Sequence, residues 1–114
     1  MGDTTASAQD AFFPGWAHLT TVVGRERGWT APSRQQFDAM CGPDGAFLIG
    51  DPATVARKML DAHEALGGIE RITFQMSTAS LDTAAMKRSI ELLGTEVAPI
   101  VRRRTHTDEV DDAR

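Results

Sequence analysis

Two short strand-like segments, each followed at once by a helix-start signal, constrain the fold of this 114-residue chain more than any other feature. The first segment, 46–50, is mainly apolar and fits a strand that is covered on both faces. The second segment, 71–76, alternates in character through Thr73 and Gln75. About sixteen residues with a helical pattern separate the segments, which favours a right-handed crossover between parallel strands. The sequence therefore predicts an α/β fold.

Four helices are predicted around these strands, at about 12–27, 33–41, 52–66 and 83–101. Ser33, Asp51 and Asp82 stand at helix starts, where their side chains can accept a hydrogen bond from a free N–H group of the first turn. Gly28 and the glycine pair at 67–68 are stop signals, because glycine readily adopts the left-handed backbone conformation.

The helical pattern also divides the chain into parts. Residues 1–10 are small and polar and are expected to be a disordered lead-in, and 104–114 are expected to be a disordered, acidic tail. A single domain is expected over 11–103. Pro99 is expected to bend or end the last helix. Helical spacing predicts that the core-facing residues of the last two helices are Val55, Met59, Ala62, Leu66, Met86, Ile90, Leu93, Val97 and Ile100.

Composition and charge narrow the classes of function. Apolar residues make up 41% and charged residues 25%, as in ordinary globular proteins. The formal net charge of -4 disfavours nucleic acid and anionic membranes as partners. Cys41 is the only cysteine, no apolar run reaches the roughly 20 residues that span a bilayer, and the first residues lack a signal-peptide pattern. A cytoplasmic location is the resulting expectation.

An ordered series of motifs resembles the carboxyl-terminal part of luciferase-like flavin-dependent oxidoreductases. The series is Phe13-Pro14-Gly15-Trp16, Gly24-Arg25-Glu26-Arg27-Gly28-Trp29, Gly50-Asp51-Pro52, Leu66-Gly67-Gly68-Ile69-Glu70-Arg71 and Ile90-Glu91-Leu92-Leu93-Gly94-Thr95-Glu96-Val97-Ala98-Pro99. The resemblance implies a (β/α)8 TIM barrel of which this chain is a C-terminal fragment, with the two predicted strands as its seventh and eighth. It also implies a monooxygenase that acts on a small organic substrate with O2 and a reduced flavin, FMN or the deazaflavin F420.

The chain is too short for a complete barrel of this kind, which needs about 250 residues. Two parallel strands alone leave both outer edges unpaired. Three interpretations stay open: a subunit that completes a barrel with another chain, an oligomer that pairs the open edges, and a truncated remnant. We expect a homo-oligomer or a complementary barrel subunit. The alternative to an enzyme is a catalytically silent α/β oligomerisation or interaction module derived from the family.

The resemblance places candidate cofactor-binding residues after the second strand, because active sites of such barrels lie at the carboxyl ends of the strands. These candidates are Gln75, which shares a strand face with Thr73 and would line the barrel mouth, and Ser77, Thr78 and Ser80, whose hydroxyls and backbone donors suit a phosphate group. An ordinary turn with local side-chain caps is the alternative for the Ser/Thr loop. For Gln75, the alternative is a position on the solvent-facing side of an incomplete sheet.

Aromatic residues of the first predicted helix are candidates for the wall of a flavin or substrate pocket. These residues are Phe12, Phe13 and Trp16, and ordinary core packing of an amphipathic helix is the alternative for all three. No residue is identified as catalytic, because the three histidines share no metal-ligand or nucleophile spacing with carboxylates or with Cys41. No metal site is predicted.

Overall fold

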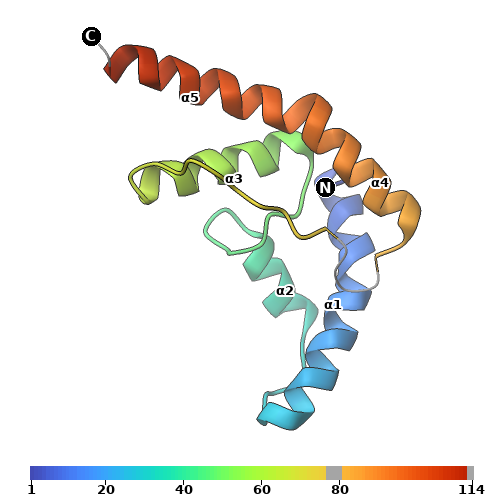
Figure 1. Cartoon of the computed structure of the whole chain (residues 1–114). Coiled ribbons are helices and arrows are strands. Elements are labelled where there is room, and N and C mark those ends of the chain that lie inside the picture. Colours follow the sequence, from blue (N-terminus) through green and yellow to red (C-terminus); the bar gives the residue numbers. More distant parts are fainter. Residues whose placement is uncertain (77–80, 113–114) are drawn as a thin grey trace.

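The computed structural model describes the backbone of residues 1–76 and 81–112, and side chains up to residue 106. Its helices are α1 Thr5–Arg27, α2 Arg34–Cys41, α3 Pro52–Ala65, α4 Thr83–Leu92, the π-helix η1 Leu93–Val97 and α5 Ala98–Asp112. The last three follow one another without a break and form one long curved rod (Figure 1). α3 packs against η1 and α5, whereas α1 and α2 pack together and extend away from the rod.

The two strands predicted from the sequence are wrong. Segments 46–50 and 71–76 lie outside the helices and belong to no sheet, so the described residues form neither an α/β fold nor a fragment of a TIM barrel. The physical reason is that a strand is stable only when neighbouring strands satisfy its N–H and C=O groups, and two strands alone provide too few partners. The Phe47 N–H donates instead to the carbonyl of Met40, at 3.0 Å.

The end of α1, both ends of α2 and α3, and the start of α4 lie within a residue of their predicted positions, because these start and stop signals act locally. The side chains of Ser33, Asp51 and Asp82 each accept a hydrogen bond from the N–H group three residues later. Gly28 ends α1 with a φ of 72°, and Gly67 follows α3 with a φ of 74°. Both angles lie in the left-handed region that favours glycine.

The start of α1 differs from the expected lead-in at 1–10. Thr4 and Ser7 form a capping box in which each side chain accepts a hydrogen bond from the other residue's backbone N–H, so the helix begins at Thr5. Pro14 consequently lies inside α1 instead of near its start. The helix loses one backbone hydrogen bond there, because proline has no N–H group.

The last helical run also extends beyond its expected end. It passes Pro99 and continues to Asp112, so α5 includes most of the segment 104–114. The wider turn of η1 immediately precedes the proline: the N–H of Ala98 donates to the carbonyl of Leu93, five residues back. We infer that this wider turn relieves the clash that proline makes with the preceding turn of a regular α-helix.

The hydrophobic core is small and lies where α3 meets η1. Its buried residues are Val55, Ala56, Met59 and Val97. Three residues of the predicted core-facing stripes are exposed instead, because no described element covers their part of the helix: Ala62, Leu66, which is 72% exposed, and Ile90, which is 53% exposed. On α4, Ser89 and Leu92 are buried in place of Ile90.

A cluster of aromatic rings joins α1, α2 and the segment 46–50. Its members are Phe12, Phe13, Trp16, Phe37 and Phe47. Phe37 is fully buried at its centre, with ring centroids 5.2 Å from Trp16 and 5.3 Å from Phe13. The Arg34 guanidinium lies 5.0 Å from the centroid of the Phe13 ring and pairs with Asp10 at 2.9 Å. The cluster holds α2 on α1.

A buried lysine connects α3 to the end of α2. The Nζ atom of Lys58 donates hydrogen bonds to the carbonyls of Gly42 at 2.9 Å, Cys41 at 3.4 Å and Phe47. The Cys41 carbonyl lies in the last turn of α2, where the helix dipole is negative and favours a cation. Burial lowers the pKa of the Lys58 ammonium and raises the pKa of the Cys41 thiol.

Candidate functional site

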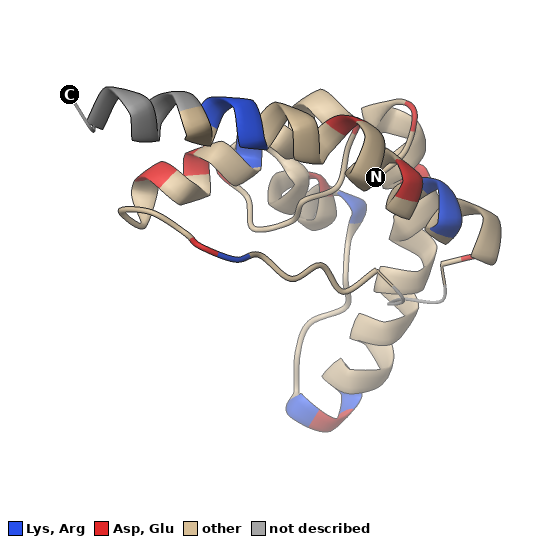
Figure 2. Cartoon of the chain, turned by 45° about the horizontal axis from the view of Figure 1, so that its top comes forward, with Lys and Arg blue, Asp and Glu red and all other residues tan. Residues whose placement is uncertain are grey.

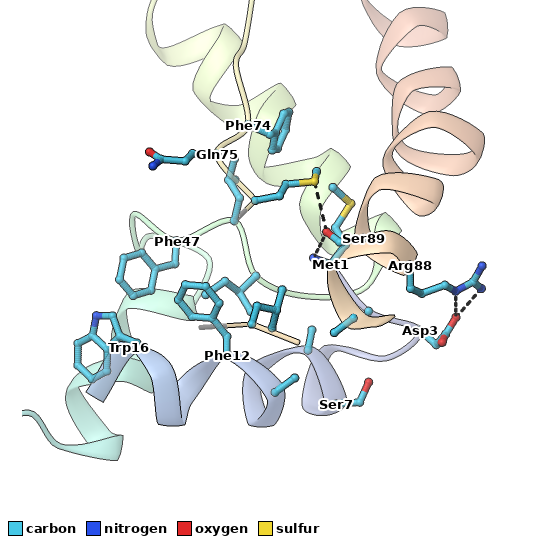
Figure 3. Close-up of a pocket in the computed structure, with 18 of the residues that line it drawn as sticks. Met1, Asp3, Ser7, Phe12, Trp16, Phe47, Phe74, Gln75, Arg88 and Ser89 are labelled. Atoms are coloured by element: carbon cyan, nitrogen blue, oxygen red, sulfur yellow. Dashed lines mark hydrogen bonds and ion pairs between the residues drawn. The ribbon is translucent and has the colours of Figure 1, made fainter. Parts of the chain in front are cut away.

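A cavity of about 510 Å³ lies between α1, α4 and the two segments that were expected to be strands. α1 contributes Phe12 and Trp16 to its wall, and the first segment contributes Phe47. The second segment contributes Phe74 and Gln75 (Figure 3). The two segments therefore reach the same cavity without pairing with each other as a sheet.

The two ends of the cavity differ in chemistry. Figure 3 shows Phe12, Trp16 and Phe47 gathered at one end and the ion pair of Asp3 and Arg88 at the other. The Phe47 ring is edge-on to both other rings, with centroids 6.4 Å from Phe12 and 6.3 Å from Trp16. Aromatic rings in such a group offer faces and edges to a flat apolar ligand.

Arg88 carries the positive charge at the polar end. Its Nη2 atom lies 2.6 Å from Asp3 Oδ1, and its Nη1 atom lies 2.8 Å from Glu91 Oε1. The Arg88 guanidinium lowers the pKa of the Asp3 carboxyl, and Asp3 in turn raises the pKa of Arg88. All three side chains are well exposed, and exposed ion pairs contribute little to stability. An anionic ligand can therefore compete with the carboxylates for Arg88.

A short hydrogen-bond chain closes the wall between these ends. The amino group of Met1 donates to Ser89 Oγ at 2.9 Å, and Ser89 Oγ in turn lies 3.7 Å from the sulfur of Met76. Ser89 is 3% exposed, and burial lowers the pKa of the Met1 amino group. These two contacts connect the first residue, α4 and the segment 71–76.

The structure brings together only some of the residues predicted for the site. Phe12 and Trp16 line the cavity together with Gln75, although the Gln75 side chain is exposed to solvent. Phe13 does not line it, since its ring packs against Phe37 on the side of α1 that faces α2. The other predicted cofactor-binding residues lie outside the described residues: Ser77, Thr78 and Ser80.

Sequence reasoning missed Phe47, Phe74 and Arg88 as parts of the cavity wall. The two phenylalanines were expected inside a sheet, and without the sheet both contribute to the cavity wall. The signal in the sequence that could have identified these two residues is the presence of an aromatic side chain in each segment. For Arg88 the sequence offers none, because nothing local separates it from the neighbouring Lys87.

Two comparisons of the sequence with known proteins were negative. A scan against protein-family models finds no match, and a search among curated proteins finds none either. Within 1–76 and 81–112, no three or more histidine, cysteine, aspartate or glutamate residues are grouped so that they could hold a metal ion. None of the helices in the described part is both long enough and apolar enough to span a membrane. The cavity is therefore the feature of the molecule that bears on its function.

Proposed function

We propose that this chain is part of a luciferase-like flavin-dependent oxidoreductase, a monooxygenase that acts on a small organic substrate with reduced flavin and O2. The observation that carries the proposal is the shared cavity of Phe12, Trp16 and Gln75. The resemblance identified Phe12 and Trp16 as candidates for the pocket wall, and about sixty positions separate them from Gln75.

The size and polarity of the cavity support a ligand of this class. Its volume of about 510 Å³ lies within the range of roughly 300–1,000 Å³ that is usual for small-molecule sites. The aromatic end suits the isoalloxazine or deazaflavin ring system, and Arg88 at the other end suits a phosphate group. Both FMN and F420 have this combination of a flat ring system and a phosphate.

The residues of this chain would bind and orient the cofactor, and the cofactor would supply the redox chemistry when bound. Phe12, Trp16 and Phe47 would hold the ring system and exclude water from one of its sides. The Arg88 guanidinium would release the Asp3 carboxylate and pair with the phosphate instead. The cavity is partly open to solvent, so a second chain is needed to enclose a reactive flavin.

The two tryptophans of the chain allow a direct test. Trp16 lines the cavity, whereas Trp29 lies beyond the end of α1, is 52% exposed and is not part of the cavity wall. In the W29F variant all tryptophan emission comes from Trp16, and in the matched W16F variant all of it comes from Trp29. We expect FMN or F420 to quench the emission of W29F saturably at micromolar concentration and that of W16F only weakly.

Arg88 provides a second arm of the same test. The R88Q variant should bind FMN more weakly while its affinity for riboflavin, which lacks the phosphate, stays unchanged. If the W29F variant is folded by circular dichroism and neither FMN nor F420 quenches it saturably, the proposal is wrong.

The second candidate is a catalytically silent oligomerisation or interaction module. It is favoured by the exposure of large apolar side chains on α1, where Leu19 is 50% exposed and Val22 is 46% exposed. The flavin titration separates the two candidates, since a silent module has no reason to bind flavin at the cavity.

A further inference from the structure

One histidine holds the turn in which the chain leaves α3. Gly67 and Gly68 form this turn, both with a positive φ, and the N–H of Gly68 donates to the backbone carbonyl of His63 at 2.8 Å. The next N–H group, that of Ile69, donates to the Nδ1 atom of the His63 ring at 2.9 Å. His63 therefore accepts from two consecutive N–H groups, one through its backbone and one through its side chain.

The hydrogen bond from Ile69 fixes the protonation state of the imidazole. A ring nitrogen accepts a hydrogen bond only when it carries no proton, so the His63 ring is neutral and its proton lies on Nε2. A second proton would make Nδ1 a donor, and it could then no longer accept from Ile69. His63 is partly exposed, so protons of the solvent reach it. This hydrogen bond therefore exists only while the ring is neutral.

The segment after the turn has few other attachments. Among the hydrogen bonds and ion pairs of the described residues, the bond to His63 is the one that involves 69–72. The far end of the segment is held differently, since Phe74 packs against the hydrophobic core and the sulfur of Met76 lies near Ser89 Oγ. Loss of the bond to His63 would therefore free 69–72 and leave 74–76 in place.

Charges of both signs surround the His63 ring. The charged residues that line the same groove come from α3 and α5: Arg57, Asp61, Glu64 and Arg104. Figure 2 shows red residues near the end of α3 beside a blue band on α5. Glu70 follows the turn and is exposed, whereas Glu96 of η1 lines a groove at the opposite end of α3. The ring also lies in the last turn of α3, where the helix dipole attracts a cation.

We propose that His63 is a pH-sensitive switch that holds the segment 69–72 while its ring is neutral and releases this segment when the ring is protonated. In the protonated state the imidazolium is attracted to the carbonyl groups at the end of α3, away from the Ile69 N–H. Histidine ordinarily changes its charge between about pH 5 and about pH 8, so the switch operates in this range. Residues 73–76 line the cavity, so the switch changes how firmly one of its walls is held. The switch does not depend on flavin binding.

The amide of Ile69 reports the state of the switch directly. Its protection factor, measured by NMR, compares its hydrogen-exchange rate with that of an unstructured chain at the same pH. We expect the Ile69 protection factor of the natural chain to be about fivefold lower at about pH 5 than at about pH 8, which corresponds to the loss of one hydrogen bond. The amide of Gly68 is the internal control, because it donates to a backbone carbonyl and should keep its protection.

Two substitutions of His63 complete the test. In H63N the side-chain oxygen takes nearly the place of Nδ1 and accepts from Ile69 at every pH, whereas H63A removes the acceptor. We expect the high protection factor for H63N and the low one for H63A at both pH values. H18N is the matched control, because His18 is exposed on α1, and it should keep the pH dependence of the natural chain.

Three results would each overturn the proposal. The first is an Ile69 amide of the natural chain that is equally protected at both pH values, and this comparison requires neither variant to fold. The second is a pH dependence of the Ile69 protection factor that persists in H63N. The third is an H63A variant, folded by circular dichroism, whose Ile69 amide is as protected as that of the natural chain at about pH 8.

Discussion

Replacing Lys58 with methionine removes a buried positive charge and keeps most of the length of the side chain. Lys58 is 6% exposed, and its ammonium donates to the carbonyls of Cys41, Gly42 and Phe47. In K58M these carbonyls lose their donor while the methionine stem still fills the space. The variant therefore isolates the contribution of the ammonium to the junction between α2 and α3.

The magnitude follows from two opposing contributions. A hydrogen bond from a charged donor contributes about 1.5–3 kcal/mol, so three give roughly 4–9 kcal/mol before desolvation is counted. Burying the ammonium costs several kcal/mol, and K58M recovers that cost. We expect a net loss of about 2–4 kcal/mol, which is a large part of the roughly 5–15 kcal/mol that stabilises a typical domain.

The assay is urea unfolding followed by circular dichroism of the helices, with K87M as the matched control. Lys87 is exposed on α4 and has the same side chain, so K87M should change the unfolding free energy by no more than about 0.5 kcal/mol. If K58M is as stable as K87M, the three hydrogen bonds contribute no more than the desolvation of the ammonium costs, and Lys58 does not stabilise the junction.

Two further predictions concern single positions. A Cβ atom at Gly45 would overlap the carbonyl of Met40, so the G45A variant should lower the unfolding free energy by about 1–3 kcal/mol in the same urea assay. A Cβ atom at Gly94 would meet no atom within 4 Å, so the G94A variant should raise the unfolding free energy by about 0.5–1 kcal/mol. Hydrogen bonds from Thr54 lower the pKa of the Asp51 carboxyl below its ordinary value of 3.8. The ionised carboxylate therefore stabilises the folded state fully at pH values above 3.8, and this contribution is lost as the pH falls through the lowered pKa. Thermal unfolding at a series of pH values should therefore show a smaller acid-induced decrease in Tm for D51N than for the natural chain, and equal decreases would contradict this role.

The helices could be predicted from the sequence because their boundaries depend on neighbours a few residues away. Ser33, Asp51 and Asp82 cap their helices through the N–H three residues later, and no distant partner is required. The Thr4 and Ser7 capping box was less readable, because the usual capping box has glutamate or glutamine where Ser7 stands, and α1 begins earlier than its pattern predicts.

The strands and most of the candidate site depend on distant contacts, which local patterns do not encode. Segments 46–50 and 71–76 have the apolar pattern of strands, yet a strand also needs neighbours to pair with. Phe12 and Phe13 are adjacent in sequence, but a helix places consecutive side chains about 100° apart, so only Phe12 reaches the cavity. No pattern in α3 distinguishes the buried Lys58 from a surface lysine.

The π-helix η1 fixes the rotation of α5 relative to α4. Its wide turn holds one residue more than a regular helical turn, and the face that Val97 presents to α3 depends on this extra residue. Deleting the exposed Gly94 would remove the extra residue and let the run wind as a regular α-helix whose later faces stay nearly where they are. If the turn narrowed with every residue kept, everything after it would rotate by about 100° relative to α4. Val97 would then leave the core although its own side chain is intact. At this point of the chain the number of residues, more than their identity, determines which helical face is inside.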